Sequence, residues 1–442
     1  MTTEVFPFRG LRYNQTLVPD LSLVVCPPYD IISQPEQRRY HKKHPDNAIH
    51  LDFGLEFTTD NDTNNRYTRA AALLDEWLAE KILVPEPAPA LYFLREEFKA
   101  PDGSPAVREG FIAAVRLSDF SEGKILPHEE TAPGAKEDRL RLIEATQANL
   151  SPIFCLYSDP EDSLVRQAKR YAGDPEISIR DEAGTRHTLW TLVDPDQVDA
   201  ISAALSRDSL LIADGHHRYE TMLAYRDERR AREHPDGDRP YDFTMVYLAG
   251  MDGDSRSVLP IHRFVSGLAK KTAGGALELL GADFDILDVP GTGEEQRRRM
   301  IGMMAETDAG RNAFGLFLAA ENSCHVLVGR RPRPMLPAAD EHSEAYRSLD
   351  ITVLDKLILS GALDIRPGGV NQGARVSFVE RTEAALERIN AGDKDLQIAL
   401  FVNPTRMEEI KTVAAAGEKM PQKSTYFYPK PLTGLVFRSL KI

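Results

Sequence analysis

The sequence predicts a mixed α/β (α+β) fold. Helix-favouring segments alternate with short aliphatic strand segments through the middle of the chain, which is typical of layered α/β proteins. The chain has 442 residues, enough for two or three domains, and its hydrophobic content of 42% is ordinary for globular proteins. We expect an N-terminal α/β segment at 1–120, a core region at 121–330 that binds phosphate or nucleotide, and a C-terminal α/β segment at 335–442 that packs back on the core.

The composition argues against several classes of function. The net charge of −14 disfavours general nucleic-acid binding, which normally needs a basic excess or stripe. Cys26, Cys155 and Cys324 lie far apart without a Cys-x-x-Cys pair, which predicts a reducing compartment and neither a disulfide framework nor a zinc site. The N-terminus lacks the features of a signal peptide, and no apolar run approaches about 18 residues. We therefore expect a soluble, cytoplasmic protein that binds neither membranes nor nucleic acid.

The N-terminal part is expected to contain a strong amphipathic helix and a pair of strands. Residues 66–81 place apolar side chains at helical spacing on one face. Residues 90–94 and 110–115 are strand-like, and the segment 101–105 between them has hairpin composition.

The remaining elements follow from the same patterns. Strands are expected at 153–157, 188–193, 209–213, 243–249, 313–318 and 396–402. Helices are expected at 137–149, near 161–171, near 350–360, at 377–390 and at 405–416.

The most informative segment runs from Asp214 to Thr221. It follows the strand at 209–213 and leads into helix-favouring residues, so the expected order is strand, tight glycine turn at Gly215, then helix. The first turn of that helix carries His216, His217 and Arg218 beside backbone N–H groups that have no partner within a helix. These donors, with the positive end of the helix dipole, are typical of a phosphate site.

An alternative interpretation of this corner stays open. An Asp-Gly pair between a strand and a helix is ordinary turn chemistry, in which Asp214 caps the helix and Gly215 supplies the unusual backbone angles. In that case the two histidines are scaffold. Adjacent histidines on a helix point about 100 degrees apart, which disfavours a shared metal ion.

A second candidate site lies in the polar loop 126–139. His128, Glu129 and Thr131 precede a helix, with Lys136 expected just before its start and Arg139 on its first turn, so that both could contact one anionic group. His128 is a candidate substrate contact, and Thr131 is a candidate phosphate contact. Glu129 is a candidate general base for a substrate hydroxyl, or a magnesium ligand. The alternative is a solvated, turn-rich loop.

Three weaker candidates complete the set. Residues 417–425 nearly match a P-loop but follow a helix, so Lys423, Ser424 and Thr425 are expected to bind phosphate only as a loop. Arg263 is a candidate substrate contact in a segment, 260–263, that we expect to end a strand and start a helix. A rigid turn at 26–30 follows the strand-like Val24-Val25 and projects Tyr29 and Asp30 as candidate substrate contacts.

These motifs together resemble the bacterial and archaeal domain of unknown function 1015 over nearly the whole chain, and the sequence is identified as a member of that family. The matching segments are Pro27-Pro28-Tyr29-Asp30, Pro127-His128-Glu129 with Thr131, Asp138-Arg139-Leu140, Asn149 to Phe154, Ala213 to Thr221, Leu259-Pro260 with His262-Arg263, and Met420-Pro421 with Lys423 to Phe427 and Pro429-Lys430.

The Asp-Gly-His-His-Arg corner is also similar to the signature of the ParB/sulfiredoxin superfamily, especially its free-serine kinases. This resemblance implies a ParB/sulfiredoxin-like nucleotide-binding core elaborated by N- and C-terminal α/β segments. It implies that Gly215, His216, His217 and Arg218 hold phosphates and that Asp214 faces the metal. By order in the chain, Glu129 is the match for the catalytic carboxylate, and His217 and Asp214 are counted with it as catalytic.

The function expected from these residues is phosphoryl transfer from ATP or ADP to the hydroxyl of a small metabolite such as serine. Arg218, Lys136 and Arg139 are expected to neutralise phosphate oxygens, and Mg²⁺ to be held by Asp214 or Glu129. Two alternatives stay open, a phosphatase or nucleotide hydrolase that uses the same site and a nucleotide-binding regulator without catalysis. Oligomeric state is also open, with a homodimer as one alternative.

Overall fold

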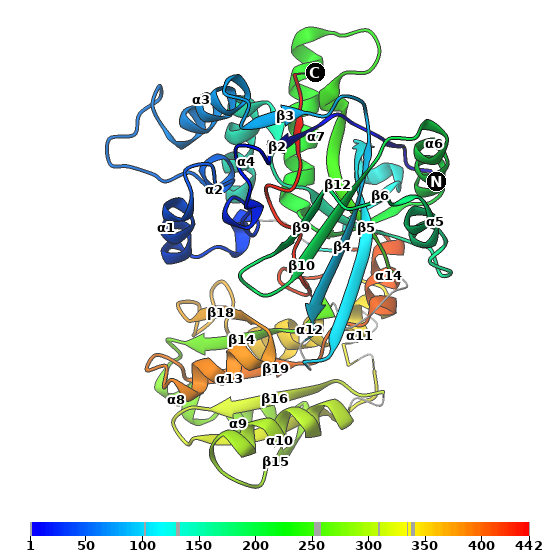
Figure 1. Ribbon diagram of the computed structural model, residues 1–442. Coiled ribbons are helices and arrows are strands. Elements are labelled where there is room, and N and C mark those ends of the chain that lie inside the picture. The colour runs from blue at the N-terminus through cyan, green and yellow to red at the C-terminus, as the bar shows by residue number, and fades with distance from the viewer. Residues whose placement is uncertain are drawn as a thin grey trace. The chain divides into compact units, whose positions relative to one another are not determined.

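The computed structural model describes residues 2–100, 103–129, 133–251, 258–307, 310–333, 335–336 and 341–441 (Figure 1). The chain divides into two compact units. The first comprises residues 1–127, 131–254 and 429–442, and the second comprises residues 128–130 and 255–428.

A nine-stranded sheet forms the centre of the first unit. Its strand order is β6 (Ile125–Leu126), β11 (Leu210–Asp214), β8 (Ile153–Tyr157), β12 (Phe243–Gly250), β5 (Pro105–Arg116), β4 (Leu91–Lys99), β10 (Arg186–Leu192) and β9 (Ile177–Arg180), with β1 (Val5–Phe6) also paired to β5. The β8–β12 and β11–β6 pairs are parallel, and the other pairs are antiparallel. The sheet is therefore mixed, and its strands come from most of the length of this unit.

A second, four-stranded sheet joins the two ends of the chain in this unit. Its order is β3 (Leu83–Pro85), β2 (Gly10–Tyr13), β21 (Phe437–Ser439) and β7 (Ala148–Asn149). Because β21 pairs with β2, the C-terminal segment returns beside the N-terminal one, and this return brings residues 429–442 into the first unit.

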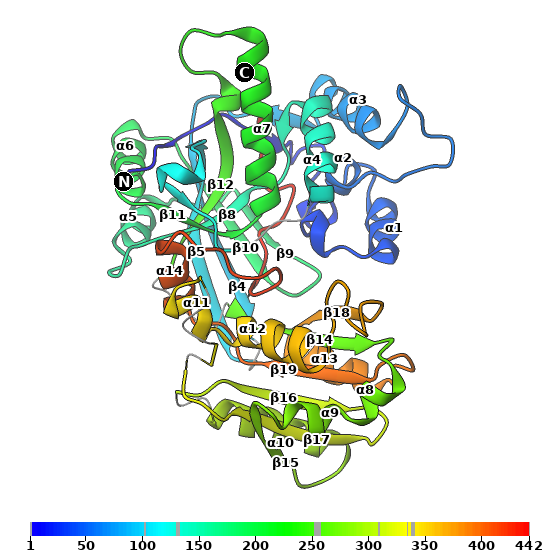
Figure 2. The ribbon, with the colours of Figure 1, turned by 180° about the vertical axis from the view of Figure 1, so that it is seen from behind.

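Helices cover the larger sheet and extend beyond it. They are α1 (Gln34–Lys43), α2 (Ile49–Asp52), α3 (Arg66–Ala79), α4 (Pro133–Thr146), α5 (Ser163–Tyr171), α6 (Pro195–Leu205) and α7 (His216–Glu233). Apolar side chains of α5, α6 and α7, such as Ile201 and Met222, share one buried core with alternate residues of the central strands, such as Phe111 and Val246. Helices α4 and α7 lie side by side (Figure 2).

The second unit has a six-stranded antiparallel sheet. Its order is β15 (Phe284–Asp288), β17 (Ser323–Gly329), β16 (Ala313–Leu318), β19 (Ile398–Val402), β14 (Ile261–Ser266) and β18 (Arg375–Glu380). A separate two-stranded sheet pairs β13 (Val258–Leu259) with β20 (Tyr426–Phe427). The helical elements are α8 (Lys270–Gly274), α9 (Ala276–Leu280), α10 (Gly293–Glu306), α11 (Glu344–Ser348), α12 (Asp350–Val353), a π-helix (Leu354–Ala362), α13 (Thr382–Asn390) and α14 (Met407–Ala415). Helices α10 and α13 pack on one face of the larger sheet and enclose its core.

The predicted mixed α/β fold is confirmed. The strands expected at 153–157 and 313–318 have the predicted bounds, and the helix that begins at His216 follows a strand that ends at Asp214. The division into segments 1–120, 121–330 and 335–442 stays a prediction about chain organisation. Among the described residues, no helix is both long and apolar enough to cross a membrane.

Four local predictions are wrong. The helix expected to reach residue 149 ends at Thr146, because residues 148–149 pair with β21 as a strand. Residues 375–380 form a strand and not the start of the helix expected from 377, because they pair along β14. The same sheet makes 261–266 continuous strand, so no helix begins near Arg263. Val24-Val25 follows a short 3-10 helix and is not a strand, because both its N–H groups turn back to the carbonyl of Leu21. Sheet partners far away in sequence override local propensity in the second and third cases.

Candidate functional site

The corner after β11 has the predicted strand–glycine–helix geometry. Asp214 ends the strand, Gly215 adopts φ +92°, and α7 begins at His216. A side chain at Gly215 would place its Cβ 3.1 Å from the guanidinium of Arg218, so glycine is required both by backbone conformation and by this close approach. The turn therefore holds Arg218 against the N-terminus of a helix that is 18 residues long.

Arg218 is buried and held by protein acceptors. Its Nη2 donates to Oδ2 of Asp214 at 2.7 Å, and its Nη1 donates to the carbonyl of Pro152 and, at 3.3 Å, to the hydroxyl of Ser151. Asp214 and Arg218 thus form an ion pair across the first turn of α7. A phosphate bound by Arg218, as predicted, would therefore have to share its guanidinium with these three partners.

Lys430 contacts the corner, and sequence reasoning did not single it out. Its Nζ lies 2.7 Å from Oδ1 of Asp214 and also forms an ion pair with Asp30. Burial by itself would lower the pKa of Lys430, but the carboxylates of Asp214 and Asp30 outweigh this effect, so the pKa is raised. Lys430 is therefore cationic and connects the N-terminal turn to the end of β11. The available signal was the Pro429-Lys430 match to the family, which follows the motif at 420–427.

Tyr29 and Arg139 lie against each other in the same unit. The guanidinium of Arg139 stacks over the Tyr29 ring at 3.8 Å from its centroid. Arg139 is buried and donates from Nη1 to the backbone carbonyl of Asp52 at 2.9 Å and to its carboxylate at 3.2 Å. Burial raises the pKa of Tyr29 to about 12, although Arg139 lowers it in part. Tyr29 is therefore neutral at physiological pH, and its ring orients Arg139.

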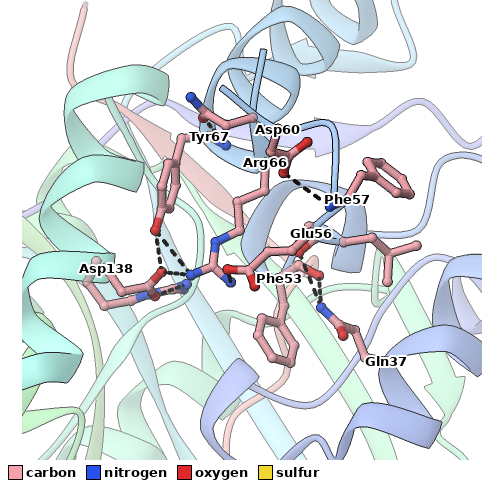
Figure 3. A network of polar contacts seen from close by, with 12 residues as sticks. Gln37, Phe53, Glu56, Phe57, Asp60, Arg66, Tyr67 and Asp138 are labelled. Carbon is pink, nitrogen blue, oxygen red and sulfur yellow. Dashed lines mark hydrogen bonds and ion pairs between the residues drawn. The ribbon is translucent and has the colours of Figure 1, made fainter. Parts of the chain in front are cut away.

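A network of polar side chains fixes the other side of Arg139. Its Nε donates to Oδ2 of Asp138 at 2.7 Å, and Oδ1 of Asp138 accepts from the hydroxyl of Tyr67 at 2.8 Å and from Arg66. Figure 3 shows Asp138 facing Arg66 and Tyr67 from the neighbouring helix, and Arg66 also forms an ion pair with Glu56 at 3.1 Å. Asp52 and Asp138 therefore both accept hydrogen bonds from Arg139 and fix the position of its guanidinium.

Two further predicted residues lie on the surface of this region. Lys136 is within α4, where it forms an ion pair with Glu220 of α7, and its side chain is 40% exposed. It therefore does not precede the helix as expected. His217 is partly exposed on the first turn of α7, and its carbonyl accepts from Thr221 at 2.6 Å, while His216 is buried.

A cavity of about 30 Å³ is lined by two of the buried arginines of this unit, Arg139 and Arg218. Arg139 and Asp52 line it together with Arg218 and Ser151. A cavity of this size has room for a water molecule, although apolar side chains such as Ile143 and Met222 form much of its wall.

The predicted residues near position 128 form a separate cluster in the second unit. His128 is buried, and its Nε2 lies 2.8 Å from Oγ1 of Thr425. Oε1 of Glu129 accepts from the backbone N–H of Lys423 at 2.9 Å, and Lys423 has a positive φ of +59°. The hydroxyl of Ser424 donates to the carbonyl of Pro421. Hydrogen bonds therefore hold the loop 421–425 against residues 128–129, an approach of two segments that the sequence left open.

Arg263 belongs to the second unit as a buried cation. Its Nη1 donates to the carbonyl of Ile261 at 2.5 Å, and its guanidinium lies 5.1 Å from the ring of Phe378. Burial lowers the pKa of Arg263 to about 10, and the charges of Asp355 and Glu129 offset that effect only in part. The predicted substrate role of Arg263 stays a prediction.

The structure places the candidate residues in two groups. The first unit holds Tyr29, Asp30, Lys136, Arg139, Asp214, Gly215, His216, His217 and Arg218. The second unit holds His128, Glu129, Arg263, Lys423, Ser424 and Thr425. Thr131 lies outside the described residues. The catalytic, phosphate-binding and substrate roles of all these residues stay predictions.

The predicted metal ligands are a poor fit to a divalent cation in this arrangement. Within the described ranges, no three His, Cys, Asp or Glu side chains are grouped as metal ligands. Both carboxylate oxygens of Asp214 face cations, Arg218 and Lys430, and one oxygen of Glu129 accepts an N–H. Mg²⁺ stays a prediction, and we derive no chemical step through it.

Comparison with known proteins gives one family match and several distant structural neighbours. The model of a family described as a protein of unknown function, DUF1015, matches residues 5–352. No functionally curated protein matches.

The structural neighbours include a free serine kinase variant in complex with AMP, with 13% identity and a TM-score of 0.35 over 69% of this chain and 83% of that one. SbnI with a C-terminal truncation, from Staphylococcus aureus, has 12% identity and a TM-score of 0.35 over 73% and 85%. A conserved hypothetical protein from Pyrococcus furiosus has 14% identity and a TM-score of 0.32 over 69% and 87%. No functional residue is carried over from these neighbours.

Proposed function

Because the chain belongs to the DUF1015 family, whose description states no activity, we propose from its own residues that it is a phosphotransferase acting on a small metabolite. In this proposal ATP or ADP donates the phosphoryl group, and the acceptor is a hydroxyl such as that of serine. The observation that carries the proposal is the corner formed by Asp214, Gly215 and the N-terminus of α7.

The corner supports phosphate binding for two physical reasons. The N–H groups of the first turn of a helix point away from its body, and the helix dipole adds positive potential there. The left-handed Gly215 has no side chain to keep a ligand from this turn. Phosphate oxygens are therefore expected to bind to the backbone of residues 216–218.

The charges around the corner are balanced before a ligand arrives. Asp30 and Asp214 carry two negative charges, and Lys430 and Arg218 carry two positive ones. A phosphate would compete with the two carboxylates for Lys430. The ammonium group of a lysine can redirect its hydrogen bonds more readily than the planar guanidinium of an arginine. We therefore propose that Lys430 shifts its contacts toward the phosphoryl group during transfer. Arg218 stays in place because Pro152 and Ser151 accept its hydrogen bonds.

Two separate assignments complete the proposal. Asp30, which is partly exposed, is proposed to bind the ammonium group of an amino-acid acceptor. Glu129 is proposed to accept the proton of the acceptor hydroxyl, which a carboxylate can do as a general base.

The test of the proposed function is product analysis. The full-length protein would be incubated with ATP or ADP, Mg²⁺ and a panel of small alcohols that includes serine, and phosphorylated product and consumed nucleotide would be quantified by ³¹P NMR. A transferase gives a phosphorylated acceptor in a yield equal to the nucleotide consumed. Release of inorganic phosphate alone would replace the proposal by hydrolysis, and no turnover with tight nucleotide binding would replace it by a regulator.

The role of Glu129 is tested in the same assay. Glu129→Gln keeps an oxygen that can accept the N–H of Lys423, so the loop is expected to stay in place. Loss of general-base catalysis typically lowers the rate by about 10²–10⁴-fold. The matched control is Glu418→Gln, which changes a carboxylate of the same unit that accepts from Ser343. Equal activity of the wild type and Glu129→Gln would reject the assignment of Glu129.

A further inference from the structure

A second pocket of the first unit, about 420 Å³ in volume, is distinct in its lining from the corner. Its walls are mainly apolar and include Phe6, Phe8, Leu11, Pro85 and Phe243. The rings of Phe6 and Phe243 meet edge to face at 5.3 Å between centroids. Pockets of about 300–1,000 Å³ with apolar walls and a few polar groups are the usual form of small-molecule sites.

The polar feature of this pocket is Arg438 on β21. It is 5% exposed, and its guanidinium donates to the carbonyl of Phe243 at 3.0 Å, to the carbonyl of Pro240 at 2.8 Å and to Oδ1 of Asn149 at 3.2 Å. All three acceptors are neutral. Within the described part of the chain, its buried Nε has no hydrogen-bond partner and no carboxylate forms an ion pair with it.

The uncompensated charge of Arg438 is unusual for a buried group. A buried charge without a counter-charge is costly, and burial lowers the pKa of Arg438 to about 10. The one carboxylate of the pocket wall, Asp238, is already paired with Arg116 at 2.6 Å. Two further lining arginines, Arg9 and Arg239, add positive charge at exposed positions. The pocket therefore combines apolar walls with an excess of positive charge.

We propose that this pocket binds a small carboxylate with an aromatic or aliphatic carbon body. The carboxylate would lie beside Arg438 and supply the missing counter-charge, and the carbon body would pack against Phe6 and Phe243. A single negative charge matches the single buried uncompensated cation, which favours a carboxylate over a phosphate dianion. The proposal is independent of the proposed phosphotransferase activity, because no residue of the corner lines the pocket.

The test compares two probes that differ only in charge, 3-phenylpropionate and 3-phenylpropionamide. Binding to the full-length protein would be titrated by saturation-transfer difference NMR at pH 7. We expect the dissociation constant of the acid to be at least about tenfold lower than that of the amide, since tenfold corresponds to about 1.4 kcal/mol and a charge-assisted hydrogen bond contributes about that much. Equal binding of both probes, or binding of neither, would overturn the proposal.

Three variants locate the site. Arg438→Met removes the charge and keeps much of the stem, so the acid is expected to lose its advantage over the amide. Phe6→Ala shortens an exposed ring on the pocket wall without opening the core, so both probes are expected to bind at least threefold more weakly. Arg298→Met, at an exposed arginine of α10, is the control and should change neither constant.

The design remains decisive if Arg438→Met does not fold. In that case the acid-to-amide ratio of the wild type and the effect of Phe6→Ala still decide whether the probe occupies this pocket. Gly215→Ala at the corner should leave binding of 3-phenylpropionate unchanged. Loss of binding in that variant would assign the acid to the corner and refute the pocket.

Discussion

Nζ of Lys430 lies 2.7 Å from Oδ1 of Asp214, although one residue is near the C-terminus and the other ends a central strand. The same ammonium forms an ion pair with Asp30 of the N-terminal turn. Segments from the beginning, the middle and the end of the chain therefore meet at one buried cation. The return of β21 beside β2 makes this meeting possible, because it brings the segment after residue 428 back into the first unit.

We predict that Lys430→Met lowers both stability and nucleotide affinity. The substitution leaves Asp214 and Asp30 close to each other without their shared cation, and breaking a buried ion pair typically costs about 3 kcal/mol or more. Urea denaturation would measure the loss of unfolding free energy, and a thermal-shift titration with ATP and ADP would measure binding. Lys441→Met is the matched control, because Lys441 pairs with Asp75 at an exposed position. An equal effect of the two substitutions would contradict a special role of Lys430.

The stability contribution of Lys430 has a defined pH dependence. Its pKa is raised in the folded protein, so its contribution is fully present below the unfolded-state pKa of about 10.4 and is lost as the pH rises through the folded-state value. The difference in unfolding free energy between the wild type and Lys430→Met should therefore be the same at pH 7 and pH 9. A difference that shrank within this range would show that Lys430 is not held as a cation.

Gly215→Ala should reduce phosphate binding more than its backbone strain alone predicts. Alanine at φ +92° costs about 1–2 kcal/mol, and its Cβ would also displace the guanidinium of Arg218. The control is Gly184→Ala, since Gly184 has a φ of +86° with no heavy atom near the added Cβ. Both variants are expected to lose stability, Gly215→Ala the more because its Cβ meets Arg218, but only Gly215→Ala should weaken binding of ATP, ADP or inorganic phosphate in calorimetric titrations. Unchanged binding in Gly215→Ala would favour the interpretation of the corner as scaffold.

The local geometry of the corner could be predicted from the sequence because its determinants are adjacent. A short aliphatic strand, a glycine and a helix-favouring run occupy consecutive positions from 210 to 233, and each is specified by its own residues. The partners of the corner could not be predicted in this way. Lys430 and Pro152 contact Asp214 and Arg218 only through the sheet order, which no local pattern encodes.

The same reason explains the errors around residues 260–266 and 375–380. The sequence predicts that residues 260–263 end a strand and start a helix. The segment is strand because β18 and β19 pair with it on both sides. The burial of Arg438 and Arg263 could not be foreseen either, because arginines are exposed in most proteins and only tertiary packing encloses these two.

The three cysteines are predicted to be unreactive in the folded protein. Cys26, Cys155 and Cys324 are buried, and burial raises the pKa of each thiol, to about 11 for Cys324. The thiolate is the reactive form, so little of it is present at pH 8. Titration with a chromogenic disulfide reagent should label less than one thiol per native chain in the time in which denatured protein shows all three. Rapid labelling of one native cysteine would show that its segment opens readily.

Asp52 and Asp138 are predicted to have opposite effects on stability as the pH changes, although both contact Arg139. Burial raises the pKa of Asp52, and Arg139 offsets this effect only in part. The contribution of Asp52 to the free energy of unfolding is therefore fully present below its unfolded-state pKa of about 3.9, and it is lost as the pH rises through its folded-state pKa. Burial also acts on Asp138, but Arg139, Tyr67 and Arg66 outweigh it and lower the pKa. The contribution of Asp138 is therefore present above about pH 3.9 and is lost as the pH falls.

Urea denaturation of the wild type, Asp52→Asn and Asp138→Asn between pH 3 and pH 7 measures both effects. The wild type should lose its advantage over Asp52→Asn as the pH rises above about 4, and should lose its advantage over Asp138→Asn as the pH falls below about 4. Each variant is the control for the other, because both remove one carboxylate charge beside the same guanidinium. If the two differences changed with pH in the same direction, the buried position of Asp52 would not control its ionisation, and Arg139 would be held by two equivalent carboxylates.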